Sequence, residues 1–173
     1  MWLKIFGSTL VVIAGTLIGF QMAARCSERP RQIRQIIGCL ASLKSYINYV
    51  AMPLPDALDR CVTGTEGPVA ELFTNVADIL QCNGWMTPQE AIDQALVQAK
   101  GKLVLCKPET EILAALGANL GYVSREEQEK YLDMVQQQLA QIESDAIKIR
   151  DQNTKMYRYL GVCGSLAVII LLL

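Results

Sequence analysis

Residue types that usually carry catalysis or metal binding are few in this chain, and histidine is absent. The absence excludes Ser-His-Asp hydrolysis, Cys-His proteolysis and His-ligated zinc. Cysteines are the remaining nucleophiles and soft metal ligands, and there are six: Cys26, Cys39, Cys61, Cys82, Cys106 and Cys163. Their spacing contains no CxxC pair of the kind that zinc and dithiol redox sites use. We expect scattered buried thiols, although the even number also permits disulfides.

Other catalytic motifs give no stronger indication of an enzyme. The sequence has neither a GxxxxGK[ST] nor a GxGxxG phosphate-binding loop. Adjacent carboxylates occur, as at Glu126 and Glu127, but they fall at predicted helix starts, where the helix dipole favours acids. We therefore predict that the protein is not an enzyme and has no catalytic residue, cofactor or metal.

Two long apolar runs lie at the ends of the chain. Of the 173 residues 51% are hydrophobic, and the mean hydropathy of +0.24 is high for a soluble domain. Ile5–Ala24 is a run of 20 residues without a charge, and the 15-residue run Tyr159–Leu173 ends the chain. A helix of about 20 apolar residues crosses a bilayer. We predict a transmembrane anchor at 1–25, a helical body at 26–157 and a shorter C-terminal transmembrane segment at 158–173.

Charges beside the first run predict its orientation. Lys4 precedes it, whereas four arginines follow it: Arg25, Arg29, Arg31 and Arg34. By the positive-inside rule the N-terminus lies outside and the body lies in the cytoplasm. A cleaved signal peptide is the alternative, but its basic residues should precede the apolar run. From Gln35 to Thr154 the chain has 9 basic and 16 acidic residues, so basic collars border an acidic body.

Gly15 and Gly19 form a GxxxG pair inside the first predicted span. Small residues at this spacing let two membrane helices approach closely, so the pair indicates a packing face for another membrane helix. The alternative is the general abundance of glycine in membrane helices.

The body reads as helical, because apolar residues repeat at intervals of three and four. The first predicted helix is Arg31–Met52, ended by Pro53 and Pro55, and Asp56–Cys61 is a short helix. Its apolar stripe consists of Ile33, Ile36, Ile37, Leu40, Leu43, Ile47 and Val50. We predict an all-α fold, an antiparallel helical bundle carried on the two transmembrane helices.

Capping signals place the remaining helices. One helix starts near Val69 and closes at Asn83, Thr87 and Glu90 form a capping box for the next, and Pro108 opens another. Leu116–Gly121 is predicted to be a corner. A second capping box at Ser124 starts one long helix that runs into the C-terminal segment. Its predicted stripe is Tyr131, Val135, Leu139, Ile142, Ala146, Ile149 and Met156.

Six blocks of sequence, in order, are specific enough to compare with a known family. They are Glu28–Arg34, Pro53–Leu58, Pro68–Phe73, Leu116–Gly121, Ser124–Gln128 and Asn153–Gly161. Together they closely resemble the stage III sporulation protein AB family of endospore-forming bacteria, over nearly the whole chain. The body also looks like the cytoplasmic domains of inner-membrane platform proteins of type II secretion and type IV pili.

The resemblance implies a non-catalytic platform subunit of a channel complex in the mother-cell membrane facing the forespore. The implied partners are a cytoplasmic secretion-type ATPase, other membrane subunits and membrane lipid. No binding of nucleic acid is expected, and the resemblance is compatible with a homo-oligomer. Candidate contact residues are Arg29, Arg31 and Arg34 beside the membrane, and Pro53, Pro55 and Asp56 at the corner. The alternatives are that the arginines serve only topology and lipid binding, and that the corner is only a helix breaker.

A second hypothesis is a membrane-anchored extracytoplasmic receptor or sensor with a helical domain that binds a ligand or partner. It requires the opposite topology, or cleavage after the first span. It would allow disulfides among Cys39, Cys61, Cys82 and Cys106.

Overall fold

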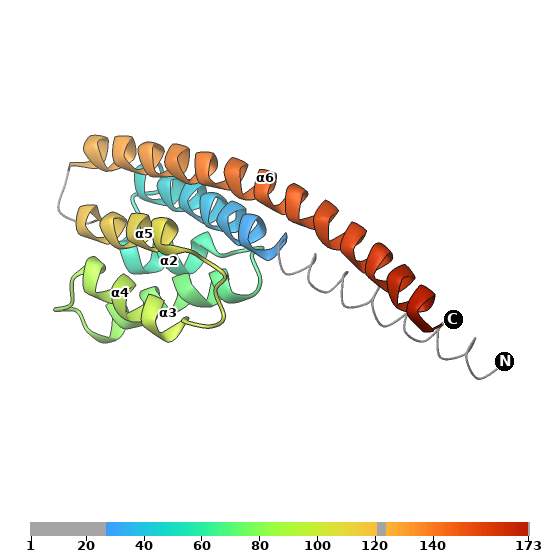
Figure 1. The fold of residues 1–173 in the computed structure, drawn as a ribbon. Helices are drawn as coiled ribbons and strands as arrows, with labels where there is room; N and C mark the ends of the chain where they lie inside the picture. The colour runs from blue at the N-terminus through green and yellow to red at the C-terminus, as the bar shows by residue number, and fades with distance from the viewer. Residues whose placement is uncertain (1–26, 121–123, 173) are drawn as a thin grey trace. The chain divides into compact units, whose positions relative to one another are not determined.

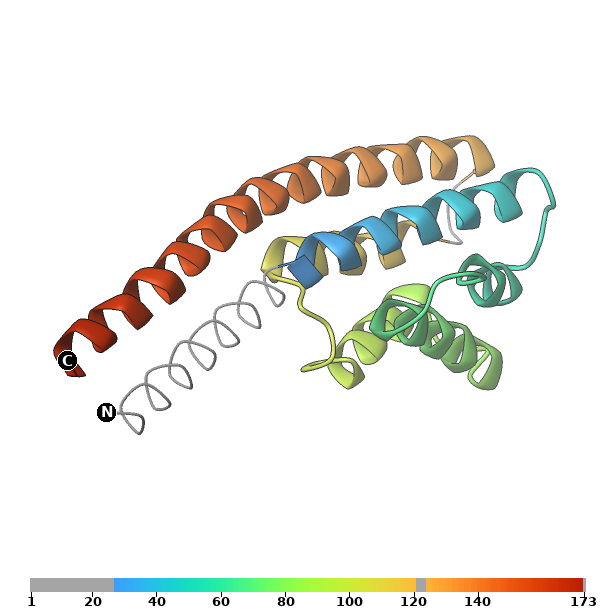
Figure 2. The same cartoon turned by 90° about the vertical axis from the view of Figure 1, so that its right-hand side faces the viewer.

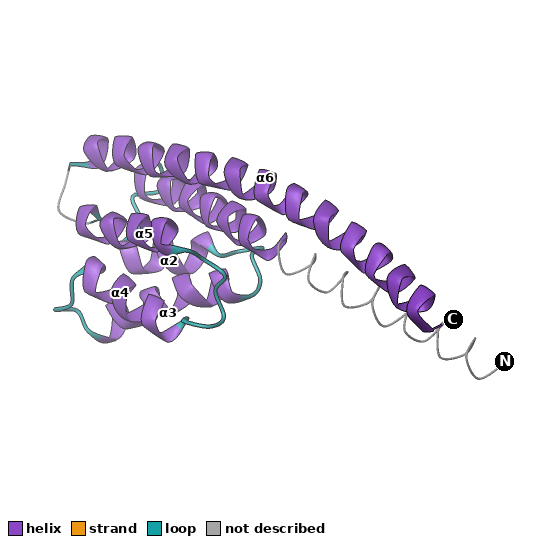
Figure 3. Ribbon diagram, viewed as in Figure 1, coloured by secondary structure: helices purple, strands orange, loops and turns teal. Residues whose placement is uncertain are grey.

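The computed structural model describes residues 27–120 and 124–172. A helix at 27–48 is followed by α2 (Leu54–Cys61), α3 (Pro68–Cys82), α4 (Pro88–Gln98), α5 (Lys107–Asn119) and α6 (Arg125–Leu172) (Figure 1). Within these ranges no strand forms (Figure 3). Lys100 and Leu103 make an isolated β-bridge. The predicted all-α fold is confirmed for this part of the chain.

The chain divides into two compact units, of which one is Arg31–Glu143 and the other contains the residues on either side of that range. Within the Arg31–Glu143 unit, residues 31–48 and the first part of α6 lie side by side and run in opposite directions (Figures 1 and 2). Helices α2–α5 lie together on one side of this pair. The antiparallel arrangement follows the prediction.

The core of this unit consists of aliphatic side chains at helical spacing. Residues 31–48 contribute fully buried side chains at Ile33, Ile36, Leu40 and Leu43. From α6 come Leu132, Val135 and Leu139, whereas α2, α3 and α5 add Leu58, Val69 and Leu116, and Leu120 directly follows α5. Burying each of these side chains stabilises the fold by about 1.5–3 kcal/mol relative to exposure.

The first body helix ends at residue 48, earlier than the predicted Met52. Pro53 disfavours a helical conformation at Met52, so the chain must leave the helix before it. Ala51 takes a positive φ of 54°, and the Met52 amide donates to the Tyr46 carbonyl at 3.2 Å. Val50, predicted to lie on the buried stripe, is consequently 56% exposed.

The capping box at the start of α4 is confirmed. The Thr87 amide donates to Glu90 Oε2 at 2.9 Å, and the Glu90 amide donates to Thr87 Oγ1 at 3.3 Å. These bonds satisfy two backbone amides that a helix start leaves without partners. They also hold the pKa of the Glu90 carboxyl below its usual value, because the Thr87 amide and hydroxyl stabilise the carboxylate.

The corner predicted at Leu116–Gly121 is wrong in its first half, because α5 continues to Asn119. Gly117 lies inside the helix and against the start of α4. A Cβ atom at Gly117 would lie 2.6 Å from Gln89 Cα, which is closer than packed atoms approach. The glycine therefore allows α4 and α5 to pack closely, and it does not end α5.

The long helix α6 is confirmed, but its predicted apolar stripe is only partly buried. Val135, Leu139 and Ala146 are buried, whereas Ile149 and Met156 are 49% and 47% exposed. Leu132, absent from the predicted stripe, is fully buried.

The predicted first membrane span and its glycine pair lie outside the described residues. The second predicted segment, 158–173, falls on the last turns of α6. No helix in the described ranges meets both the length and the apolarity that a membrane crossing requires.

Candidate functional site

The corner between the first body helix and α2 has two exposed apolar side chains, just before the predicted contact residues Pro53, Pro55 and Asp56. Tyr49 and Val50 follow the end of the helix at 27–48 and are 82% and 56% exposed. The chain then turns through Ala51, and the Pro53 carbonyl accepts the Ala57 amide at 2.9 Å to begin α2. We call Tyr49–Asp56 the corner surface.

Each predicted residue of the corner surface has a defined place in it. Pro53 is exposed and precedes the first residue of α2, and Pro55 is half-buried at the second position of that helix. Asp56 is exposed in the first turn, where the helix dipole favours a carboxylate. Immediately after it, Ala57 and Leu58 are buried. The corner surface is thus a rigid turn fixed to the core, with an aromatic ring and an aliphatic side chain facing outward.

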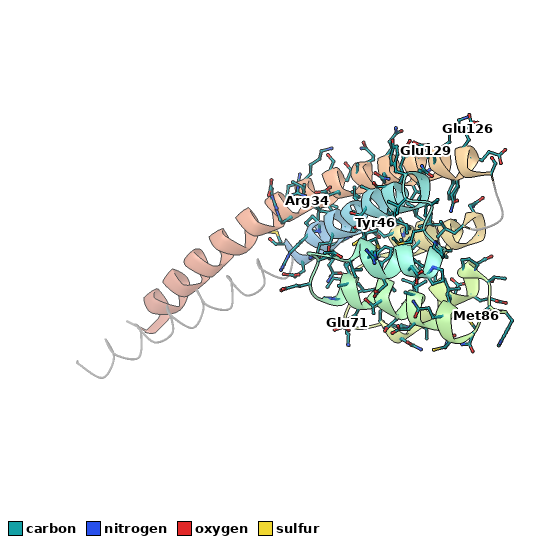
Figure 4. All side chains as sticks on the ribbon, turned by 180° about the vertical axis from the view of Figure 1, so that it is seen from behind. Arg34, Tyr46, Glu71, Met86, Glu126 and Glu129 are labelled. Carbon is teal, nitrogen blue, oxygen red and sulfur yellow. The ribbon has the colours of Figure 1, made fainter. Side chains whose placement is uncertain are left out.

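The predicted arginines do not form one cluster of free charges. Arg34 Nε donates to Glu143 Oε1 on α6 at 2.7 Å, and the Glu143 side chain is only 13% exposed. Arg34 lies at one end of the unit, away from Met86 and Glu126 at the other (Figure 4). Arg31 is exposed, and both Arg29 and Arg31 have interaction partners. Arg34 therefore joins two long helices, a role that the sequence did not predict.

A second ion pair joins the same helices. Lys44 Nζ lies 2.8 Å from Asp133 Oδ1 and 3.1 Å from Glu129 Oε1 of α6. The hydrogen bonds to the two carboxylates, first to Asp133 and then to Glu129, raise the pKa of Lys44 above its usual value. Together with Arg34–Glu143, this contact fixes the register of the antiparallel pair.

The interior of the Arg31–Glu143 unit contains a small apolar cavity. It lies between α2, α3, α4, α5 and the first body helix and is lined by apolar side chains alone: Leu43, Leu58, Leu72, Phe73, Val76, Ile92, Leu113, Leu116 and Leu120. In the described part of the chain, no three His, Cys, Asp or Glu side chains are grouped so that they would hold a metal ion.

Thiols are the remaining reactive groups. Cys39 and Cys61 are buried, Cys82 and Cys106 are exposed, and these four are free in the structure. Two of the four are buried as expected, but these two are not scattered. The structure brings Cys39 and Cys61 together, although 22 positions separate them in the sequence.

Its sequence and fold place the chain in a known protein family. A model of the stage III sporulation protein AB family matches residues 4–173. The chain belongs to this family.

Two relatives of the stage III sporulation protein AB family support the assignment. Stage III sporulation protein AB of Bacillus subtilis (strain 168) is 36% identical over 171 residues, which is 99% of both chains. A solved structure of a stage III sporulation protein AB matches with a TM-score of 0.67 and 34% identity. That match covers 72% of this chain and 98% of the solved one, so the two share a fold.

Two exposed aromatic residues in this family member escaped the sequence analysis. Tyr49 sits on the corner surface, and Trp85, 79% exposed, lies in the α3–α4 connection. Large aromatic rings are usually well buried, and exposed ones are enriched at interfaces. A signal for both was available, because each directly precedes or follows a helix end marked by proline, asparagine or glycine.

Proposed function

We propose that the protein is a non-catalytic platform subunit of a sporulation-specific channel complex between mother cell and forespore. In this proposal it sits in the mother-cell membrane and couples a cytoplasmic secretion-type ATPase to the other membrane subunits. Membership of the stage III sporulation protein AB family supports the sporulation role. The resemblance of the body to secretion platform domains supports the coupling role.

Membrane attachment in this proposal rests on the sequence. The charge-free run Ile5–Ala24 has the length of a membrane span, and the run Tyr159–Leu173 ends the chain. The arginines after the first run favour a location of the body on the cytoplasmic side of the membrane. A cytoplasmic ATPase would be on the same side and could reach the body. Anionic lipid headgroups would attract the same arginines.

The observation that carries the coupling role is the corner surface. Tyr49 and Val50 are exposed beside a turn that the core holds in place, and a rigid, amphipathic aromatic residue is a common anchor of an interface. Asp56 adds a charge at the edge of the same surface, where complementary charge would steer the encounter. The helix before the corner is linked to α6 by the ion pairs of Lys44. In this proposal a force applied by a partner at the corner surface is transmitted through this helix to α6.

Co-purification tests the proposal. The full-length protein is expressed with the secretion-type ATPase encoded beside it, extracted in mild detergent and captured by an affinity tag. We expect the ATPase to be recovered with the wild type. The variant Tyr49→Ala/Val50→Ser should lower the recovery of the ATPase about tenfold or more. Losing an interface anchor weakens the binding free energy by about 1.4–2 kcal/mol, and about 1.4 kcal/mol is a tenfold change in affinity.

Val97→Ser is the matched control, because Val97 is 71% exposed on α4, a helix that is not part of the corner surface. It should leave ATPase recovery unchanged. Wild-type recovery that persists in the corner variant would remove the corner surface from the interface. Failure of the wild type to retain the ATPase, with both proteins folded, would contradict the coupling role itself.

A further inference from the structure

Two buried cysteines from different helices meet in the Arg31–Glu143 unit. Cys39 lies on the first body helix and is 1% exposed, and Cys61 is the last residue of α2 and is 3% exposed. Cys39 Sγ contacts Thr65, whose amide donates at 2.8 Å to the carbonyl of Val62, directly after Cys61, so the two thiols are neighbours. The Cys61 Sγ also donates to the Leu58 carbonyl at 3.0 Å, which holds this thiol in place.

The connection between α2 and α3 covers the pair on one side. Cys39 Sγ donates to Thr65 Oγ1 at 3.7 Å, and Gln35 Nε2 donates to the Glu66 carbonyl at 3.2 Å. Thr63, Gly64, Glu66 and Gly67 of this connection are exposed. The thiols are therefore closed off from bulky reagents, yet a single exposed loop separates Cys39 from solvent on this side.

The two thiols differ in their acidity. When the Cys61 thiol turns its proton from the Leu58 carbonyl to Cys39, this hydrogen bond stabilises the Cys39 thiolate and lowers the pKa of Cys39 to about 7, against the opposing effect of burial. The same hydrogen bond and burial raise the pKa of Cys61. Cys39 is therefore the more readily ionised of the two thiols, and the thiolate is the reactive form of cysteine, while Cys61 retains its proton.

We propose that Cys39 and Cys61 form a disulfide-forming site that a small hydroperoxide oxidises reversibly. The Cys39 sulfur attacks one oxygen of hydrogen peroxide, the O–O bond breaks, and the sulfenic acid forms as hydroxide leaves and takes up a proton. The Cys61 sulfur then attacks the sulfenic sulfur, the S–O bond breaks, and the thiol proton leaves in water. Two thiols lose two electrons and two protons, and the peroxide becomes two waters.

The disulfide would close a loop from Cys39 to Cys61 that contains the whole corner surface. It would fix the first body helix to the end of α2 and reduce the freedom of the turn between them. This inference rests on the contact between the thiols and is independent of the proposed coupling to an ATPase.

Peptide mapping of the oxidised full-length protein tests the proposal. The reduced protein in detergent is treated with hydrogen peroxide, the remaining thiols are blocked, and trypsin with a glutamate-specific protease digests it without reductant. Cleavage separates residues 35–44, which contain Cys39 alone, from residues 61–66, which contain Cys61 alone. We expect these two peptides to be linked in mass spectrometry and to separate again after dithiothreitol.

Single variants resolve the order of the steps. Cys61→Ser should abolish the linked peptide and leave Cys39 as a sulfenic acid that dimedone traps. Cys82→Ser is the matched control, since Cys82 is exposed outside the pair, and should retain the link. Circular dichroism checks that each variant is folded, and the wild-type map does not depend on the variants.

A folded wild-type protein in which peroxide oxidises Cys82 or Cys106 while Cys39 and Cys61 stay reduced would overturn the proposal. A link from Cys39 to any other cysteine would overturn it as well.

Discussion

At the scale of single residues, Gly117 shows how the absence of a side chain positions two helices. A Cβ atom there would meet the backbone of Gln89 at 2.6 Å and 3.0 Å, and backbone atoms do not move aside as a flexible side chain does. We expect Gly117→Ala to lower the free energy of unfolding by about 1–3 kcal/mol, the usual cost of overpacking. Denaturant unfolding followed by circular dichroism measures the change.

Gly38 provides the control for Gly117. It also lies inside a helix, but it is exposed and a Cβ atom there would meet no atom within 4 Å. Gly38→Ala should therefore stabilise the protein by about 0.5–1 kcal/mol through helix propensity. If both substitutions changed stability in the same direction, close packing at Gly117 would not be the cause.

The capping box of α4 predicts a dependence of stability on pH. Because the pKa of Glu90 is lowered in the folded protein, its charge stabilises the fold fully above its unfolded pKa of about 4.3. That contribution is lost as the pH falls through the lower, folded pKa. Glu90→Gln should lower the Tm at pH 7, and the difference from the wild type should shrink on acidification below about pH 4.3.

Thermal unfolding at a series of pH values checks this prediction. Gln is also suited to the third position of a capping box, so the variant isolates the effect of the charge. A difference in Tm that stayed constant down to pH 3 would mean that the carboxylate charge at Glu90 contributes nothing.

At the scale of elements, the helix starts marked by a capping box were predicted correctly, whereas the end of the first body helix and the role of Gly117 were not. Thr87 and Glu90 specify a start by local hydrogen bonds, and the structure confirms them. The end of the first body helix depends on how Pro53 acts on the residues before it, and Val50 was therefore misplaced. Gly117 was taken as a helix breaker because only the tertiary contact with Gln89 shows its packing role.

The antiparallel pairing of the first body helix with α6 gives a prediction at this scale. The Lys44 side chain is only 22% exposed and forms ion pairs with both Asp133 and Glu129. Lys44→Gln therefore removes both ion pairs at once. We expect a loss of about 0.5–1 kcal/mol in the free energy of unfolding, near the upper end for partly exposed ion pairs. Unfolding in denaturant at low and high salt measures it, and the loss should be smaller at high salt.

Lys148→Gln is the matched control for Lys44→Gln. Lys148 pairs with Asp145 one turn away on the same helix, and both side chains are more than half exposed. Its loss should cost a few tenths of a kcal/mol, because such pairs add about 0.2–0.5 kcal/mol to a helix. Equal effects of the two substitutions would argue against a special role of Lys44 in holding the pair of helices together.

At the scale of the whole molecule, the sequence predicted where the candidate site lies but not all of the residues that form it. Pro53, Pro55 and Asp56 located the corner, because prolines interrupt a helix visibly. Tyr49 was missed because its exposure depends on where the preceding helix stops. Arg34 was read as a membrane-side charge, and its partner Glu143 is too distant in the sequence for any local pattern to indicate the pair.

The proposed topology makes the exposed Cys82 a natural reporter of the side on which the body lies. With the body in the cytoplasm, a membrane-impermeant maleimide should label Cys82 in inverted membrane vesicles and leave it unlabelled in intact cells. Peptide mapping distinguishes Cys82 from the other thiols, and permeabilised cells give the value for full labelling. Labelling of Cys82 in intact cells would instead support the receptor or sensor hypothesis.

Charge variants test whether the arginines set this topology. Arg25→Gln, Arg29→Gln and Arg31→Gln remove three positive charges beside the first apolar run, and they leave the Arg34–Glu143 contact in place. An excess of basic residues keeps the segment beside a membrane span on the cytoplasmic side. In the triple variant, part of the protein should therefore adopt the opposite orientation, and its Cys82 should be labelled in intact cells. Arg60→Gln, on α2 and far along the chain from both apolar runs, should not. An unchanged pattern in the triple variant would mean that lipid binding or partner contact, and not orientation, accounts for these arginines.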